Sequence, residues 1–174
     1  MTPRRYDLAN IPGLKVLGRC PELTKSLTLF WTGSGLAVAV AATELWVELY
    51  ADYERLEPWL DIIINGDLSQ RLLLTRGQQR ICVFRGQSPD IVKQVRLLRD
   101  TQAMPDDDRT LLQIRALETD GHFLSPPEPA LKLEFIGDSI TSGEGASGAV
   151  SETDWVPACF SAYYNYTYET AARL

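Results

Sequence analysis

Apolar and polar residues alternate with a period of two through much of the first 120 residues, and this alternation constrains the fold more than any other feature. Residues 44–50 read Glu-Leu-Trp-Val-Glu-Leu-Tyr, so an aliphatic side chain occupies every second position. Successive side chains of a β-strand point to opposite faces, so the pattern predicts a strand with one buried face. Turn residues recur at the spacing typical of an all-β sandwich, which is the fold class we expect here. The other predicted strands are 26–31, 36–40, 60–64, 68–75, 79–85, 93–99 and 111–117.

The tripeptide Asn65-Gly66-Asp67 lies between two of these predicted strands. Asparagine and glycine both tolerate the positive φ that a type I′ turn requires at its two central residues. We therefore expect a tight hairpin that joins 60–64 to 68–75.

The alternating pattern ends near residue 120, and a proline-rich segment follows. Residues 125–129 read Ser-Pro-Pro-Glu-Pro, a stiff composition that is typical of a linker. A strand is predicted at 131–136 and a helix at 161–174, with a glycine turn after the strand, and this order of elements opens an α/β domain. We therefore expect three parts: a β-sandwich domain at 1–122, a proline-rich linker at 123–130, and an incomplete α/β domain at 131–174.

The charge balance and the apolar segments exclude two classes of partner. Seventeen basic residues stand against 23 acidic ones, so the net charge is −6 and the basic surface of a nucleic-acid-binding protein is absent. The apolar stretch 36–42 is far shorter than the roughly 20 residues that cross a bilayer. No apolar segment follows Arg4 and Arg5, as it would in a signal peptide. We expect no nucleic-acid partner and no membrane partner; the chain as written fits a cytoplasmic protein, and a trimmed chain fits a secreted one.

The cysteines and the acidic residues lack the spacing of metal sites. Cys20, Cys82 and Cys159 are odd in number and far apart, which favours reduced thiols over disulfides or zinc ligands. Residues 106–108 are three consecutive aspartates and could form a calcium loop. Calcium ligands alternate along the chain, however, so a solvated turn is the favoured interpretation and we expect no metal.

The motif most informative about function is the block Gly-Asp-Ser-Ile-Thr at 137–141, which follows the predicted strand 131–136. Ligands of α/β folds bind at the carboxyl ends of strands, so the hydroxyl of Ser139 is placed where a substrate would bind. The Ser139 N–H, at the start of a helix, would point outward and could stabilise an oxyanion. A structural alternative is a helix cap, a common role of Asp and Ser at such turns. The G-x-S-x-G motif of α/β-hydrolases is not matched, because Thr141 replaces the second glycine.

This block resembles the first motif of the SGNH (GDSL-type) hydrolases. The wider chain resembles carbohydrate esterase family two, in which a jelly-roll β-sandwich precedes an SGNH domain. That resemblance implies a jelly-roll-like sandwich followed by the start of an α/β/α SGNH domain. It also implies a serine esterase that removes acetyl groups from plant-type polysaccharides or sugars. The segments that carry it are Gly18-Arg19, 31–35 (Trp-Thr-Gly-Ser-Gly), Ile64-Asn65-Gly66, the proline-rich linker, 133–141 and the tyrosine-rich 164–173.

The resemblance implies a role for two residues of the block. Ser139 is the expected nucleophile and its backbone N–H one oxyanion donor, while Asp138 is expected to support the loop. The later Asp-x-x-His motif of the family is absent from these 174 residues, so the base His is expected outside this chain, which alone would then be inactive. His122, the single histidine, is expected to be a solvated linker residue.

The same resemblance defines the expected partners. These are an acetylated saccharide or polysaccharide and the remaining part of the catalytic domain. No cofactor is expected, because the acyl group rests on the serine during the reaction.

Two other functions fit parts of the sequence. Aromatic side chains of the sandwich could stack on sugar rings and make it a non-catalytic carbohydrate-binding module, although packing is the favoured role of each ring. Residues 143–148 match G-x-G-x-x-G, but they neither follow the predicted strand directly nor open a helix, so a nucleotide site is disfavoured. The candidate stacking residues are Trp46, Tyr50, Tyr53 and Trp59.

Overall fold

The computed structural model describes residues 2–20, 23 and 25–174. Two 3-10 turns, η1 (Leu8–Asn10) and η2 (Pro157–Cys159), and the helix α1 (Tyr166–Arg173) accompany the strands of this part of the chain. No helix formed by these residues is long and apolar enough to cross a membrane. The strands are β1 (Arg4–Asp7), β2 (Lys15–Leu17), β3 (Leu27–Thr28), β4 (Gly35–Ala41), β5 (Glu44–Asp52), β6 (Trp59–Ile64), β7 (Asp67–Leu73), β8 (Gly77–Arg85), β9 (Lys93–Arg99), β10 (Leu111–Thr119) and β11 (His122–Leu124).

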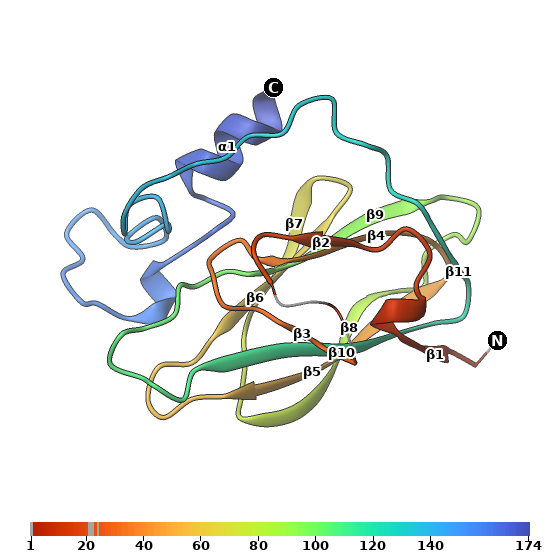
Figure 1. Cartoon of the computed structure of the whole chain (residues 1–174), viewed down its shortest axis with the longest axis horizontal. Helices are drawn as coiled ribbons and strands as arrows, with labels where there is room; N and C mark the ends of the chain where they lie inside the picture. Colours follow the sequence, from red (N-terminus) through yellow and green to blue (C-terminus); the bar gives the residue numbers. More distant parts are fainter. Residues whose placement is uncertain (1, 21–22, 24) are drawn as a thin grey trace.

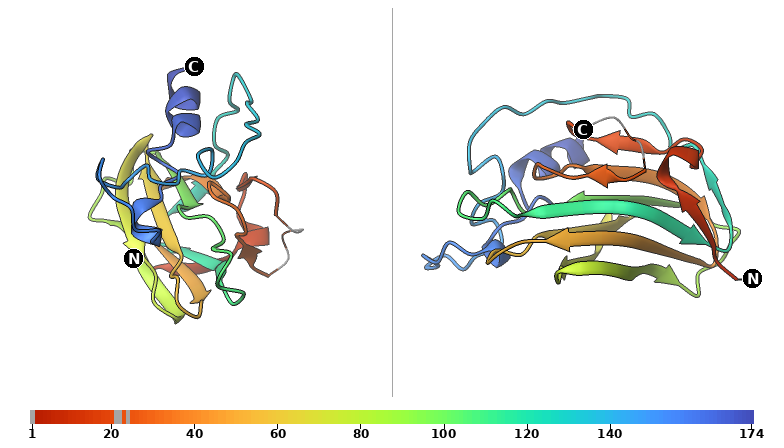
Figure 2. Two further views of the ribbon diagram at one scale, coloured as in Figure 1. Left: turned by 90° about the vertical axis from the view of Figure 1, so that its left-hand side faces the viewer. Right: turned by 60° about the horizontal axis from the view of Figure 1, so that its bottom comes forward.

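Two sheets pack face to face, as Figures 1 and 2 show. The first sheet has the order β1-β10-β5-β8, and β3 also pairs with β10. The second has the order β11-β4-β9-β6-β7, and β2 also pairs with β4. Neighbouring strands run antiparallel in both sheets. The predicted β-sandwich is therefore confirmed.

The core lies between the sheets and is built from the aliphatic residues of the alternating patterns. In β5, Leu45, Val47 and Leu49 are fully buried, whereas Trp46 and Glu48 between them reach the outer face of the first sheet. Burying each leucine contributes about 1.5–3 kcal/mol relative to exposure. The second sheet supplies Leu36, Val38, Val40, Leu60, Ile62, Val95 and Leu97 to the same core.

The predicted hairpin is present between β6 and β7. Asn65 has φ 55° and Gly66 has φ 97°, the two positive values that a type I′ turn requires. The ladder then runs from Ile64 paired with Asp67 to Trp59 paired with Leu73, with an irregularity between Ile62 and Ile63.

Three short strands, β1, β2 and β11, lack an alternating pattern and are not predicted by the sequence. In β11, Phe123 is buried and packs edge-to-face against Tyr6 with ring centroids 5.2 Å apart. Backbone pairing with β4 continues to Leu124. Pairing therefore extends two residues past the expected end of the sandwich at 122, into the segment predicted as linker, because Phe123 completes the core at this end.

The strand predicted at 131–136 is not formed. This stretch is part of a long connection that passes over the sandwich between β11 and the turns that begin at residue 138 (Figure 1). Leu131 and Ile136 are 56% and 92% exposed. A strand needs a neighbour to accept and donate its backbone hydrogen bonds. Within the described residues no strand pairs with this stretch, which explains its irregular conformation.

The helix predicted at 161–174 is shorter than expected. It begins at Tyr166, where the Asn165 side chain caps it by accepting the Thr167 N–H at 3.3 Å. Residues 161–165 remain non-helical because they run along the outer face of the second sheet, where the Ala162 N–H donates to Asp100.

Candidate active site around Ser139

The block at 137–141 forms a compact turn that exposes Ser139 to solvent. Asp138 stabilises this turn twice: its Oδ1 accepts the Ile140 N–H at 3.1 Å, and its carbonyl accepts the Ser142 N–H at 3.1 Å. The Ser139 carbonyl accepts the Glu144 N–H at 3.1 Å. The geometry is compatible with the loop-supporting role expected of Asp138, and the role of Ser139 as nucleophile stays a prediction.

Helix α1 is tied to the same turn. The Asn165 amide donates to the Thr141 carbonyl, while its oxygen caps the helix. The Thr141 hydroxyl lies 2.8 Å from the Tyr166 hydroxyl. Asn165 is buried, so the helix start and the turn form one packed unit.

Gly143, the first glycine of the stretch 143–148, is required by the packing of the backbone. Its φ is +85°, and a Cβ at this position would lie 2.1 Å from the Ser161 carbonyl oxygen. The Gly143 carbonyl accepts the Ser161 N–H at 3.0 Å. No strand runs directly into 143–148 and no helix begins there, so the structure favours a packing role over a phosphate-binding one.

His122, expected to be a solvated residue where the sandwich meets the linker, is exposed and is the first residue of β11. β11 is at the end of the sandwich opposite the turns that follow residue 137, as Figures 1 and 2 show from different sides. His122 is therefore not within reach of Ser139 to act as its base, because a general base must approach within hydrogen-bond distance.

A cleft of about 470 Å³ is lined in part by Ile136 and Gly137, which lie just before Ser139 in the sequence. Trp31, in the loop between β3 and β4, is 63% exposed at this cleft. Arg19 reaches across to Glu134, with Nη2 and Oε1 3.4 Å apart. No role was predicted for Arg19 or Trp31 from the sequence, although both lie in segments that carry the family resemblance. The cleft is lined by Arg19, Trp31, Glu134, Phe135, Ile136 and Gly137.

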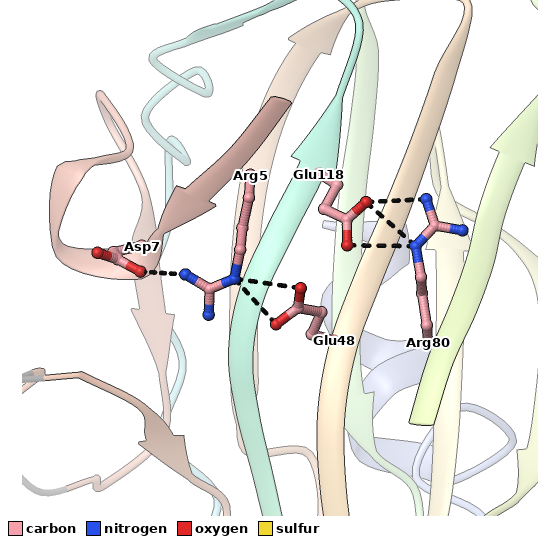
Figure 3. A network of polar contacts seen from close by, with 5 residues as sticks. All are labelled: Arg5, Asp7, Glu48, Arg80 and Glu118. Atoms are coloured by element: carbon pink, nitrogen blue, oxygen red, sulfur yellow. Dashed lines mark hydrogen bonds and ion pairs between the residues drawn. The ribbon is translucent and has the colours of Figure 1, made fainter. Parts of the chain in front are cut away.

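The aromatic residues considered for sugar stacking each carry an arginine over the ring. The Arg80 guanidinium lies 3.9 Å from the Trp46 ring centroid, on the outer face of the first sheet. Arg80 also pairs with Glu118, and Arg5 pairs with Glu48, so this face is covered by an ion-pair network (Figure 3). Because a guanidinium group already stacks on each of these four rings, they are disfavoured as a platform for binding sugars. The other three pairs are Arg115 with Tyr50 at 4.6 Å, Arg76 with Tyr53 at 4.9 Å and Arg71 with Trp59 at 4.3 Å.

The aspartates at 106–108 do not form a shared site. Asp107 is buried, and its carboxylate accepts backbone N–H groups of Glu54, Arg55 and Leu56 at 2.7–2.9 Å. Burial alone would raise the pKa of Asp107, but these N–H groups outweigh it and lower the pKa to about 2. Asp107 is thus a structural anchor for the loop after β5. Among the described residues no group of three or more His, Cys, Asp or Glu side chains is placed to hold a metal ion.

Comparison with known proteins places this fold among carbohydrate esterases of known structure. An acetyl xylan esterase from the rumen bacterium Butyrivibrio proteoclasticus is 38% identical, with a TM-score of 0.94, over 99% of this chain and 47% of that one. A carbohydrate esterase family 2 enzyme with a carbohydrate-binding domain from Corynascus thermopiles (Myceliophthora fergusii) is 26% identical, with a TM-score of 0.65, over 86% and 43%. A family two carbohydrate esterase from Cellvibrio japonicus, 24% identical with a TM-score of 0.80 over 99% and 50%, shares the fold.

The resemblance to carbohydrate esterase family two is therefore confirmed over nearly the whole chain. The chain spans about half the length of these solved structures. No family profile and no curated protein matches the sequence.

Proposed function

We propose that the chain contributes the nucleophile of a serine esterase that removes acetyl groups from carbohydrates. The observation that carries the proposal is the 38% identity and TM-score of 0.94 to an acetyl xylan esterase across 99% of this chain. The exposed serine in the turn at 137–141 supplies the chemical group that such a reaction needs.

In the proposed reaction the Ser139 Oγ attacks the carbonyl carbon of the acetyl ester. A histidine from outside these residues takes the hydroxyl proton and then gives it to the departing sugar oxygen. The Ser139 N–H donates to the developing oxyanion, and one such donor contributes about 3–4 kcal/mol to catalysis. Water then attacks the acetyl-serine, with the same histidine as base, and releases acetate.

We further propose that 131–174 is the first part of an SGNH domain, joined to the sandwich by the proline-rich linker. Several apolar side chains of this part are exposed, which supports a larger domain that covers them; they include Leu131, Leu133, Phe135, Ile136 and Ile140. The remaining part of that domain is the proposed source of the histidine.

The cleft beside the block is the proposed site for the saccharide. Trp31 offers an exposed ring for the apolar face of a sugar, and Arg19 offers donors for its hydroxyl groups. Both residues come from the sandwich, so in this proposal the sandwich contributes to substrate binding as well as to support.

The test is hydrolysis of a small acetyl ester and of acetylated xylan by the chain together with the remainder of its catalytic domain. Ser139→Ala is expected to lower kcat by at least about a thousandfold. Ser142→Ala is the matched control, because Ser142 lies in the same turn and its hydroxyl only donates to the Asp138 carbonyl at 3.3 Å. Equal activity of the Ser139 variant and the wild type would overturn the proposal.

A further inference from the structure

A buried cluster of charged groups lies where residues 158–162 meet the second sheet. Asp61 in β6 and Asp100 after β9 are both fully buried. Arg71, the cross-strand partner of Asp61 in β7, brings its Nε to 2.6 Å from Asp100 Oδ2. Two carboxyl groups therefore share the neighbourhood of one guanidinium group, on the outer face of the sheet.

Asp100 and Arg71 hold the segment 158–162 through its backbone. Asp100 Oδ1 accepts the Ala162 N–H at 2.6 Å, and the Asp100 carbonyl accepts it at 3.1 Å. Arg71 Nη2 donates to the Ala158 carbonyl at 3.2 Å and to the Phe160 carbonyl. These contacts attach a segment without regular structure to the rigid sheet.

The held segment in turn contacts the turn of Ser139. The Ser161 N–H donates to the Gly143 carbonyl at 3.0 Å, and the Ser147 N–H donates to the Cys159 carbonyl at 3.1 Å. The Glu144 N–H, next to Gly143, donates to the Ser139 carbonyl. These hydrogen bonds, together with the short backbone segments between them, join the sheet to the turn.

We propose that Asp100 and Arg71 are positioning residues, through which the sandwich orients the turn that carries Ser139. The proposal rests on the proposed function only in taking Ser139 as the nucleophile. A serine displaced by 1 Å loses much of its reactivity, so a rigid anchor for the turn has a direct chemical consequence.

Asp61 is the third member of this clamp, which consists of Asp61, Arg71 and Asp100. Burial is the main cause that raises the pKa of Asp61, to about 9, and the charge of Asp100 adds to it. The charge of Arg71 and the Tyr163 N–H both lower the pKa of Asp61, but they do not outweigh burial. Of the other ionisable groups on the packed elements, the Tyr168 hydroxyl lies near Asp61, and Arg96 lies near Tyr168. Asp61 is therefore neutral at pH 7 and leaves the Arg71 charge to Asp100.

Hydrogen exchange of the chain measures the clamp without any assay of activity. Arg71→Ala is expected to accelerate amide exchange at least tenfold in both 158–163 and 140–147, with β4, β5 and β10 unchanged. Arg71→Lys keeps a positive charge beside Asp100 and is expected to restore part of the protection. Arg80→Ala is the matched control, because Arg80 pairs with Glu118 at 2.8 Å on the opposite sheet.

Unchanged exchange in either segment, or the same change in the Arg80 variant, would overturn the proposal. In the acetyl-ester assay, Arg71→Ala is expected to lower kcat by about tenfold with little change in KM, and an effect confined to KM would also contradict it. A failure of Ser139→Ala to lose activity would overturn the proposed function and leave the exchange result standing.

Discussion

Gly143 and Ser161 are in backbone contact: the Ser161 N–H donates to the Gly143 carbonyl at 3.0 Å, and a Cβ on Gly143 would lie 2.1 Å from the Ser161 carbonyl oxygen. This contact joins the turn of Ser139 to the segment held by the clamp. Position 143 favours glycine for two separate reasons: its φ is +85°, and there is no space for a Cβ atom.

Gly143→Ala is expected to break this contact and to accelerate exchange of the Ser161 amide at least tenfold, because both the conformation and the space oppose a methyl group. Gly145→Ala separates the two causes, since Gly145 has φ +76° but nothing within 4 Å of an added Cβ. The Ser161 amide should keep its protection in that control. Equal effects of the two substitutions would contradict the close approach.

Asp61→Asn is expected to stabilise the protein more at pH 8 than at pH 4. The pKa of Asp61 is about 9 in the folded protein and about 3.9 in an unfolded chain, so the folded state binds the extra proton. Its contribution to stability is complete below about pH 4 and declines as the pH rises toward 9. Urea unfolding of wild type and variant at several pH values measures the difference in unfolding free energy.

Asparagine removes this pH dependence because its amide does not titrate, and it keeps the shape of the neutral carboxyl group. Asp67→Asn serves as control, since Asp67 is exposed in the β6–β7 hairpin. A free-energy difference between Asp61→Asn and wild type that does not vary with pH would show that Asp61 is charged in the folded protein.

Asp107→Asn is expected to destabilise the protein at pH 7 by about 1–3 kcal/mol, because the amide NH₂ cannot accept the backbone N–H groups of 54–56. The folded pKa of Asp107, about 2, lies below its unfolded value, so its contribution is present above about pH 4 and is lost as the pH falls toward 2. Thermal unfolding from pH 7 to pH 2 checks both statements. Asp108→Asn is the control, because Asp108 is the exposed neighbour. It should change neither the stability at pH 7 nor the loss of stability toward pH 2.

Trp31→Ala is expected to weaken binding of xylo-oligosaccharides by about five- to tenfold, a loss of about 1 kcal/mol for one stacking ring. Isothermal titration calorimetry measures the affinity. Trp46→Ala is the control on the other face of the molecule, where Arg80 covers the ring. A larger loss from the Trp46 variant would move the saccharide site to the first sheet.

The strands of the sandwich were predictable where burial of one face dictates the residue pattern. Leu45, Val47 and Leu49 show this, and the Asn65-Gly66 turn was predictable because few residues accept its dihedral angles. β1 was not, because Arg4–Asp7 is mostly polar and joins the edge of the first sheet by backbone pairing with β10.

The candidate site was predictable only in part. The Ser139 turn was identified from the resemblance of the block at 137–141, and no spacing rule derives it. Asp61 and Arg71 face each other across the β6–β7 hairpin, but Asp100 joins them only when β9 pairs with β6, so the sequence does not reveal the complete clamp. One signal was present: Asp61 is an acidic residue inside the apolar run 60–64, and burying such a residue costs free energy unless it is paired or hydrogen-bonded.

Covalent labelling shows directly whether Ser139 is the reactive serine. The chain, together with the remainder of its catalytic domain, is treated with a p-nitrophenyl phosphonate ester, which phosphonylates activated serines, and its peptides are analysed by mass spectrometry. We expect one phosphonyl group on Ser139, none on Ser142, and no labelling of the Ser139→Ala variant. Labelling of another serine, with Ser139 unmodified, would show that Ser139 is not the nucleophile.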